Sequence, residues 1–576
     1  MGMGASNVTA RVAASLGGLV AVAPQFAPAL DVPHGGVLLS VPLLLALGLL
    51  DHTAGRLDLP DGYYGLDSIL LLMAFMALAR LETVEDLRYH APGEWGQLLG
   101  LDRVPEVRTL RSKIAHLARE GKAREWSAAL CQRWMSAAPE QVGAFYIDGH
   151  VRVYNGHQTD LPRHYVARQK LCLRATTDYW VNARDGQPFF VVNQAVDPGL
   201  IQVIEDKILP SLLALLPADN VGAGDTASRA QSDTPPPLQR PHHRFTLIFD
   251  REGYSPEFFS RLNDQQVACV TYHKFPQENW PVDEFYAQTV TLVSGESVVM
   301  KLAERGTRMT NGLWLRQIRK LSTQGHQTAI LTTDYHSEAA PLASSMFARW
   351  SQENFFKYAR KHFALDRLAD YRTEAMDETV MLVNPAYRAL DGQVRSCQAK
   401  LQRSWVEFGA TACVEPIEPN QMEQYLKKKA ALQECIEQRT AELATLKKAR
   451  KDTPRHIAIK DLPEADRFKQ LSTQSKYVLD TIKMIAYRAE TAMAAIVRES
   501  MSMSRPDEAR TLLRSLYTTE ADLIPDHALN TLTVRLHHSA NACNDGLIRA
   551  LCAKLNDTET LFPRTNLRLI FALGSN

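Results

Sequence analysis

Three acidic residues in this sequence follow patterns that would bring their carboxylates together in a folded protein. Asp148 ends the apolar, aromatic and β-branched run 144–147, and Asp250 ends a similar run, 245–249. Both runs are typical of buried strands, which would place these carboxylates at the edge of a sheet. Glu353 lies further along, in a helical pattern. Three converging carboxylates can hold hard divalent cations, and two cations about 3.5–4 Å apart can promote phosphoryl transfer.

Each of these carboxylates also has a purely structural interpretation. Asp148 and Asp250 are followed by glycine-containing segments typical of turns, so either residue alone would be weak evidence of a site. Around Glu353, charged residues recur at steps of four, four and three, and they share one helix face: Arg349, Glu353, Lys357 and Arg360. That face could hold a metal and a phosphate backbone. Alternatively, it is a solvated face that gains about 0.2–0.5 kcal/mol per ion pair.

The elements that must position the first two carboxylates lie within residues 140–275. We expect strands at 144–150, 171–182, 188–194, 245–251 and 267–273, with helices at 198–216 and after Ser255-Pro256. This order predicts a mixed sheet with flanking helices, in which Asp148 and Asp250 lie on the first and fourth strands. The two carboxylates can meet only if those strands are neighbours.

Residues 218–240 are predicted to be a flexible insertion, since they are rich in Gly, Ser and Pro.

After residue 275 the sequence pattern changes twice. Residues 276–335 predict a β-rich insertion carrying basic residues, and residues 336–375 return to a helical pattern that contains Glu353. Residues 376–576 are predicted to be mostly helical, with a strand-like piece at 566–572. Apolar residues at steps of three and four, including Trp405 on the first helix, predict an antiparallel coiled-coil hairpin over 390–450.

Residues 1–125 are predicted to be entirely helical. Gly100 is typical of a helix end and Pro105 of the first turn of another helix. In that second helix an apolar face lies beside a basic face, which contains Arg108, Arg111, Arg119 and Lys122. This pattern is compatible with helix-turn-helix DNA binding, in which Arg108 and Arg111 would contact DNA. The alternative is an ordinary amphipathic surface helix.

Composition excludes a few classes of protein. The chain has 576 residues, 45% hydrophobic and 22% charged, as in ordinary globular proteins. Its net charge of +1 gives no overall basic field, so any nucleic acid must be held by local patches. The eight cysteines lack metal-binding spacing and are typical of reduced thiols in a cytosol. No apolar run reaches the roughly 20 residues of a membrane span, so we expect no membrane partner.

With its carboxylates in the order Asp148, Asp250 and Glu353 on strand, strand and helix, the chain resembles the DDE transposases of bacterial insertion sequences. A subgroup of these has a β-strand insertion before the glutamate, as residues 276–335 would provide. Its signature around the glutamate is a Tyr, an Arg, the Glu and a Lys. Here Arg349 and Glu353 agree, Met346 stands at the tyrosine position, and Arg360 followed by Lys361 stands at the lysine position. The resemblance spans most of the chain from about residue 60.

The resemblance implies an RNase H-like catalytic domain that cleaves DNA and transfers strands. It implies two Mg²⁺ ions, or Mn²⁺ in their place, on Asp148, Asp250 and Glu353. Four cations would contact DNA around the glutamate: Arg349, Lys357, Arg360 and Lys361. The expected partner is double-stranded DNA, bound by a homodimer in a bacterial cytoplasm. Two alternatives stay open, a decayed or domesticated transposase that binds DNA without cutting, which Met346 favours, and a helical scaffold built on the coiled coil.

Overall fold

The structure is a computed structural model, and the chain divides into two compact units. The first unit contains residues 1–158, 162–372 and 471–576, and the second contains residues 159–161 and 373–470. The residues that the structure describes are 6–157, 159, 161, 163–166, 169–216, 243–276, 278–292, 297–347, 350–367, 372–376, 378, 380–412, 419, 421–464, 469–499, 506–539 and 542–574. The predicted flexible insertion, 218–240, lies outside these residues.

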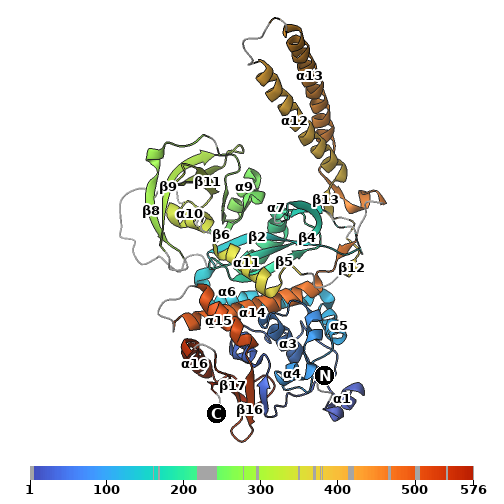
Figure 1. Cartoon of the computed structure of the whole chain (residues 1–576), viewed down its shortest axis with the longest axis vertical. Helices are drawn as coiled ribbons and strands as arrows, with labels where there is room; N and C mark the ends of the chain where they lie inside the picture. The colour runs from blue at the N-terminus through green and yellow to red at the C-terminus, as the bar shows by residue number, and fades with distance from the viewer. Residues whose placement is uncertain are drawn as a thin grey trace. The chain divides into compact units, whose positions relative to one another are not determined.

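A large mixed sheet forms the centre of the first unit (Figure 1). Its path through the described residues runs β3–β4–β2–β6–β7–β11–β10–β9–β8, and β5 pairs with β4 beside this path. β2 is antiparallel to β4 and parallel to β6, and β6 is parallel to β7. The strands of its first half are β2 (Ala144–Val153), β3 (Arg163–Val166), β4 (Leu171–Asn182), β5 (Pro188–Gln194), β6 (Phe245–Ile248) and β7 (Val267–Tyr272).

Most of these strands agree with the sequence prediction. Residues 171–182 and 188–194 form β4 and β5 with the expected bounds, because each is an apolar β-branched run on either side of the Asp185-Gly186 turn. β3 was not predicted. The helix expected at 198–216 is three joined pieces: α7 (Leu200–Val203), a π-helical turn (Ile204–Ile208) and α8 (Leu209–Leu215). The helix after Ser255 is α9 (Pro256–Asp264), and Ser255 caps it by accepting a hydrogen bond from the Phe258 N–H.

The predicted β-rich insertion extends the same sheet. β11 pairs with β7, β10 pairs with β11 and β9, and β8 forms the outer edge. Two helices follow it, α10 and α11, and α11 carries Glu353. The bounds of these elements are β8 (Tyr286–Thr291), β9 (Ser297–Arg308), β10 (Trp314–Leu321), β11 (Gln327–Thr332), α10 (Ala339–Phe347) and α11 (Trp350–Phe363).

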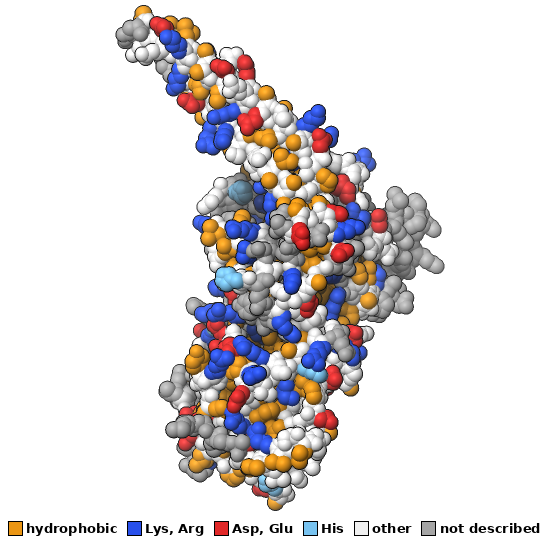
Figure 2. Space-filling model, turned by 90° about the vertical axis from the view of Figure 1, so that its right-hand side faces the viewer, with side chains coloured by type: hydrophobic (Ala, Val, Ile, Leu, Met, Phe, Trp, Pro, Cys, Tyr) orange, Lys and Arg blue, Asp and Glu red, His pale blue; other side chains and the backbone are white. Residues whose placement is uncertain are grey.

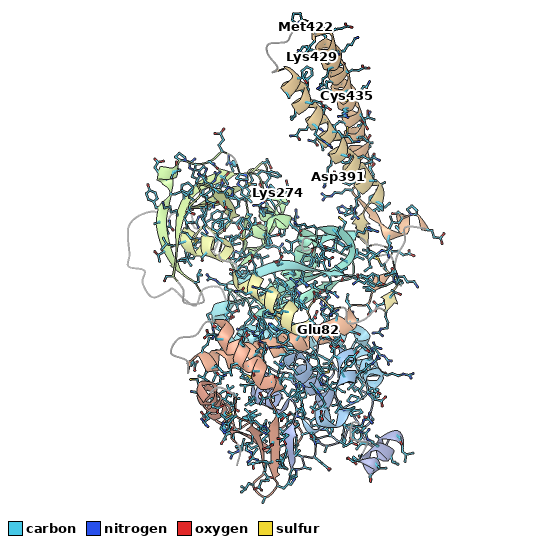
Figure 3. The ribbon with its side chains drawn as sticks, viewed as in Figure 1. Glu82, Lys274, Asp391, Met422, Lys429 and Cys435 are labelled. Atoms are coloured by element: carbon cyan, nitrogen blue, oxygen red, sulfur yellow. The ribbon has the colours of Figure 1, made fainter. Side chains whose placement is uncertain are left out.

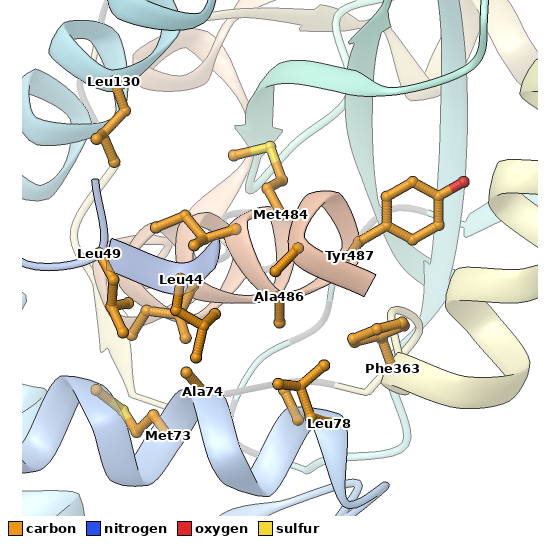
Figure 4. Close-up of a cluster of buried hydrophobic side chains, with 14 of the residues drawn as sticks. Leu44, Leu49, Met73, Ala74, Leu78, Leu130, Phe363, Met484, Ala486 and Tyr487 are labelled. Atoms are coloured by element: carbon orange, nitrogen blue, oxygen red, sulfur yellow. The ribbon is translucent and has the colours of Figure 1, made fainter. Parts of the chain in front are cut away.

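One long buried helix, α14 (Gln474–Glu499), packs the N-terminal helices against the sheet. In Figure 1 it lies between β5 and the helix α3 (Leu66–Leu78), and α6 (Lys122–Ala137) also contacts it. Figure 4 shows Met484, Ala486 and Tyr487 of α14 within the apolar cluster that also contains Met73 and Leu78. Each fully buried Leu or Met side chain contributes about 1.5–3 kcal/mol. The N-terminal region is therefore part of the same core as the sheet.

A second sheet joins the two ends of the chain. β1 (Ala29–Val32) pairs with β16 (Ala521–Asp526), which is followed by β17 (Thr531–Leu536) and β18 (Arg568–Leu573). The prediction that residues 1–125 are all helical was therefore wrong at β1, and residues 376–576 contain three strands of this sheet. β1 is four residues long and pairs with a strand almost five hundred residues away, so local sequence patterns could not reveal it. The last strand was expected at 566–572.

In the second unit, α12 (Pro385–Ala412) and α13 (Met422–Asp452) form an antiparallel hairpin. Asp391 pairs with Arg450 near its base, and Glu407 lies 3.7 Å from Lys428 toward its tip. Figure 3 shows Met422 and Lys429 at the tip of the hairpin and Asp391 near its base. Ser404 is buried between the helices while Trp405 is 55% exposed, so the prediction of Trp405 on the seam was wrong. In the space-filling view of Figure 2, basic, acidic and hydrophobic side chains alternate along the outside of the hairpin.

Candidate active site

Asp148 lies within β2, and Asp250 follows the end of the adjacent parallel strand β6 by two residues. The prediction that Asp148 ends its strand was wrong, because β2 continues to Val153 in its pairing with β4. Tyr146 of β2 is directly opposite Ile248 of β6, and each aspartate follows its paired residue by two positions. The expectation that these strands are neighbours is therefore confirmed. Asp250 also begins a short 3-10 turn (Arg251–Gly253), in which its Oδ1 accepts a hydrogen bond from the Glu252 N–H at 2.9 Å. This bond fixes the direction of the Asp250 carboxylate at the end of β6.

Two further carboxylates, Asp197 and Glu252, lie near this pair. The pKa of Glu252 is raised to about 7, by burial and then by the negative charges of Asp250, Asp197 and Asp148. Like charges disfavour one another's ionised forms only when they are close. The four carboxylates therefore form one electrostatically coupled group, which a cation would stabilise.

Asp197 is held by hydrogen bonds from three directions. Its carboxylate accepts bonds from the Tyr179 hydroxyl at 2.7 Å, the Thr177 hydroxyl at 3.0 Å and the Gly199 N–H at 2.8 Å. Burial and the nearby charge of Asp197 raise the pKa of Tyr179 well above its usual range, so the tyrosine remains a donor at neutral pH. The sequence prediction missed Asp197 and Glu252. Asp197 follows the apolar run of a buried strand, β5, as Asp250 follows that of β6, so the same signal could have found it.

Glu353 lies in the first turn of α11, which packs on β2 and β4. Phe355 contacts the ring of Trp180 at 5.3 Å between centroids, and Phe356 stacks on His150 at 5.6 Å. Trp180 is the direct cross-strand partner of Asp148. Residues three apart share one side of a helix, so Glu353 and Phe356 project toward the same side of α11. The Glu353 side chain is exposed.

The three predicted carboxylates are brought into one region without forming a tight cluster. In the part of the chain that the structure describes, one group of three His, Cys or carboxylate ligand atoms lies within 4.8 Å of one another, and it consists of Asp31, Glu520 and His537. Asp148, Asp250 and Glu353 are farther apart than that. Because all three are acidic, mutual repulsion opposes closer approach.

The cations predicted around Glu353 differ in their environments. Lys357 and Lys361 are exposed and continue, at steps of four residues, the stripe that Glu353 begins. Arg360 is half-buried, and its Nε lies 4.0 Å from Oδ2 of Asp366. Arg349 lies outside the described residues. The exposed face of α11 thus carries one carboxylate followed by two lysines.

The predicted DNA-binding helix is shorter than expected. It is α5 (Val107–Leu117), and Arg119 and Lys122 lie beyond its end: Arg119 begins a 3-10 turn that ends at Gly121, and Lys122 begins α6. Its apolar face is buried as predicted, by Val107, Leu110, Ile114 and Leu117. Arg108 is exposed, while Arg111 forms an ion pair with Glu85. The basic stripe on this helix is reduced to these two arginines.

Fold and site together define a mixed α/β protein that places one carboxylate within β2 and another just after the end of its neighbour β6. The comparison with protein families gives this class a more specific identity: residues 2–575 match the Transposase_29 family, described as "Transposase protein". The chain belongs to this transposase family. No curated protein matches the sequence. Among the described residues, no helix combines the length and the apolar character needed to cross a membrane.

Proposed function

We propose that this family member is a DDE transposase, which cleaves DNA and transfers strands with Asp148, Asp250 and Glu353 as its catalytic carboxylates. The observation that carries the proposal is the parallel pairing of β2 with β6, which sets Asp148 beside Asp250 at the same level of the sheet. A transposase acts on DNA, and bound divalent cations are the usual means of moving phosphoryl groups with carboxylates alone.

The topology of the sheet supports an RNase H-like catalytic domain. The first and fourth of the strands predicted from the sequence, β2 and β6, lie side by side, and α11 covers the strand pair β2–β4. Strands β8–β11 stand between the second aspartate and the glutamate, as in the subgroup with a β-strand insertion. The catalytic domain would then consist of residues 140–275 and 336–375, interrupted by this insertion.

The donor atoms at the site fit Mg²⁺, or Mn²⁺ in its place. All the candidate ligands are carboxylate oxygens, which hard divalent cations prefer. Burial and then the negative charges of Asp250, Asp197 and Asp148 raise the pKa of Glu252, so bound cations would relieve an existing repulsion. Two Mg²⁺ ions on Asp148, Asp250 and Glu353 would supply an activated water and stabilise the leaving oxygen.

The remaining residues would position the DNA. Lys357 and Lys361 follow Glu353 on the exposed face of α11, where their charges would attract the phosphate backbone toward the site. Arg108 would contact DNA from α5. Tyr179 and Thr177 keep Asp197 fixed beside the catalytic pair. Correct positioning can contribute several kcal/mol to such a reaction without any covalent enzyme intermediate.

The proposal is tested by nicking of supercoiled DNA that contains the ends of the element. The full chain should nick in Mg²⁺ and not in EDTA, and Asp148→Asn should abolish nicking while it leaves DNA binding intact. Equal nicking by the parent and Asp148→Asn would refute the assignment. DNA binding without nicking by the parent would instead support a decayed transposase.

Met346, which favours that alternative in the sequence, is 1% exposed and packs in an apolar cluster with Tyr146 and Ile248.

A further inference from the structure

A group of basic side chains, two of them charged at neutral pH, gathers where the end of α11 meets α15 (Pro506–Thr518). We call Lys361, His362 and Arg514 the α11–α15 cluster. One guanidinium nitrogen of Arg514 lies 2.6 Å from Nε2 of His362, and the other donates a hydrogen bond to the Thr511 hydroxyl at 2.8 Å. Lys361 is exposed, while His362 and Arg514 are half-buried. The cluster is therefore anchored on two helices and open to solvent on one side.

The α11–α15 cluster and the residues around it carry more positive than negative charge. Burial, followed by the charges of Arg514 and other cations, lowers the pKa of His362 to about 4, so its ring is neutral at pH 7. The cations that act on this ring are Arg514, Arg80, Lys361 and Arg510. Behind the cluster, the carboxylate of Glu490 binds both Arg80 and Arg510.

Within the described part of the chain, the two outer cations of the cluster, Lys361 and Arg514, have no acidic counterpart. Among the residues that the structure describes, no carboxylate lies within ion-pair distance of Arg514 or Lys361. The partners of Arg514 are instead a neutral ring and a hydroxyl. A guanidinium in this position retains its capacity to bind an anion, and its planar fork matches the oxygens of a phosphate group.

We propose that the α11–α15 cluster binds a backbone phosphate of double-stranded DNA, with Arg514 and Lys361 as its charged contacts. This inference rests on the proposed function, because it assigns one more DNA contact to the same protein. The position on α11 supports DNA as the ligand. Lys361 is eight residues after Glu353 on the same exposed stripe, about 12 Å along the helix. A duplex held by Lys357 at the catalytic end would thus reach Lys361 and Arg514 next.

The competing explanation is that Arg514 only fastens α15 to α11 through His362. The two explanations differ in how DNA affinity depends on salt, since each phosphate contact that is lost reduces the slope of log K against log salt by about 0.9. Arg514→Gln removes the charge and keeps a hydrogen-bond donor for His362. Arg514→Lys keeps the charge. Arg568→Gln is the control, because Arg568 is also partly exposed but pairs with Glu559 on another part of the same unit.

The experiment measures binding of the full chain to a DNA duplex in EDTA, over a series of salt concentrations. We expect Arg514→Gln to weaken binding about 3- to 10-fold and to lower the salt slope by about one, with Arg514→Lys close to the parent and Arg568→Gln unchanged. Unchanged affinity and slope for Arg514→Gln would overturn the proposal. If Arg514→Gln unfolds at a lower temperature than the parent, exposed Lys361→Gln replaces it as the deciding variant, with the same expectation.

Two further measurements distinguish the remaining explanations. Inorganic phosphate at millimolar concentration tests whether the cluster binds a free anion. If phosphate stabilises the parent but not Arg514→Gln, and both bind DNA equally well, the DNA assignment is overturned. Nicking in Mg²⁺ separates this inference from the proposed function. If the parent does not nick and Arg514→Gln still loses one unit of salt slope, the catalytic proposal fails and the phosphate contact stands.

Discussion

The ring of Phe356 on α11 lies almost parallel to the ring of His150 on β2, with centroids 5.6 Å apart and planes 12° apart. Phe356 is three residues after Glu353, and His150 is two residues after Asp148. Because both separations keep the paired side chains on one side of their element, this contact joins the glutamate helix to the aspartate strand at the level of the proposed site. The stacking thereby sets how far Glu353 can lie from Asp148.

Replacing Phe356 with Ala should therefore impair catalysis more than binding. The loss of a half-buried ring should cost less stability than the 3–5 kcal/mol of a fully buried Phe. We expect slower nicking and a higher Mg²⁺ requirement, because Glu353 is held less firmly, while DNA affinity remains close to that of the parent. Phe356→Leu should restore part of the activity. Tyr286→Ala, which removes a ring that is 69% exposed on β8, is the control. An unchanged Mg²⁺ requirement in Phe356→Ala would contradict this role.

Substitutions of Glu353 and of Arg360 should have different effects on nicking and on DNA binding. Glu353→Gln keeps the size of the side chain and removes the charge that would hold a metal, so we expect near-complete loss of nicking with DNA binding intact or tighter. Arg360→Ala should weaken DNA binding and flatten its salt dependence, with residual nicking at saturating DNA. Nicking by Glu353→Gln at the parental rate would remove this residue from the site. If both variants lose only a few tenths of a kcal/mol of stability and keep full function, α11 presents a merely solvated face.

On α5, Arg108 should matter more for DNA binding than Arg111. Arg111 already forms an ion pair with Glu85, whereas Arg108 is exposed on the same helix. We expect Arg108→Ala to weaken binding to the ends of the element and to lower the salt slope by about one, with a smaller effect for Arg111→Ala. Titration of binding against salt for both variants is the measurement. Unchanged binding in the double variant would show that α5 is an ordinary amphipathic helix.

The strands of the candidate site could be predicted from sequence because their signals are local. The runs before Asp148 and Asp250 are apolar, and both formed strands, although β2 continues through Asp148 to Val153 and β6 ends two residues before Asp250. Their adjacency could only be hypothesised from element order. Glu252 gave no pattern of its own, because its importance arises from the charges of Asp148, Asp197 and Asp250, which only the fold brings near it.

The predictions that were wrong concern contacts between distant parts of the chain, which local sequence patterns do not encode. Apolar spacing predicted Trp405 at the interface between the two helices of the hairpin. The interface instead contains its neighbour Ser404, whose hydroxyl accepts a hydrogen bond from Arg439 of the opposite helix. Hydrophobicity alone could not anticipate a polar contact at that position. β1 was missed because its pairing with β16 depends on a contact across nearly the whole chain. Local patterns thus predicted the strands of the candidate site better than the elements that enclose them.

Glu490 on α14 should be among the residues on which the stability of the first unit depends most. Its carboxylate is fully buried and binds Arg80 of the α3 end, Arg510 of α15 and the Tyr358 hydroxyl of α11. Glu490→Gln would leave two guanidinium groups without a counter-charge in the interior, which typically costs about 3–5 kcal/mol. Denaturant unfolding should detect this loss. Glu559→Gln, which breaks an exposed pair with Arg568, should cost less than about 1 kcal/mol. Equal effects of the two substitutions would contradict the assignment.

The attachment of the N-terminal helix should depend on pH through Asp102. Helix α1 (Val8–Ser15) is held to the body by this carboxylate, which accepts hydrogen bonds from Arg11 at 2.6 Å, the Tyr63 hydroxyl at 2.6 Å and the Asn7 N–H at 3.2 Å. Burial alone would raise the pKa of Asp102, but the bonds from Arg11, Tyr63 and Asn7 outweigh it and hold the pKa well below its usual range.

A carboxyl group whose pKa is depressed by folding stabilises the folded state above its unfolded pKa, about 3.9, and this stabilisation is lost as the pH falls through the folded value. We therefore expect Asp102→Asn to unfold more easily than the parent at about pH 6, and the difference to shrink as the pH is lowered to about 3. Denaturant unfolding at several pH values measures it. Asp557→Asn, at an exposed position after the helix α16 (Ala542–Asn556), should show no such trend. A difference between the parent and Asp102→Asn that stays constant over this range would mean that the charge of Asp102 does not hold α1 in place.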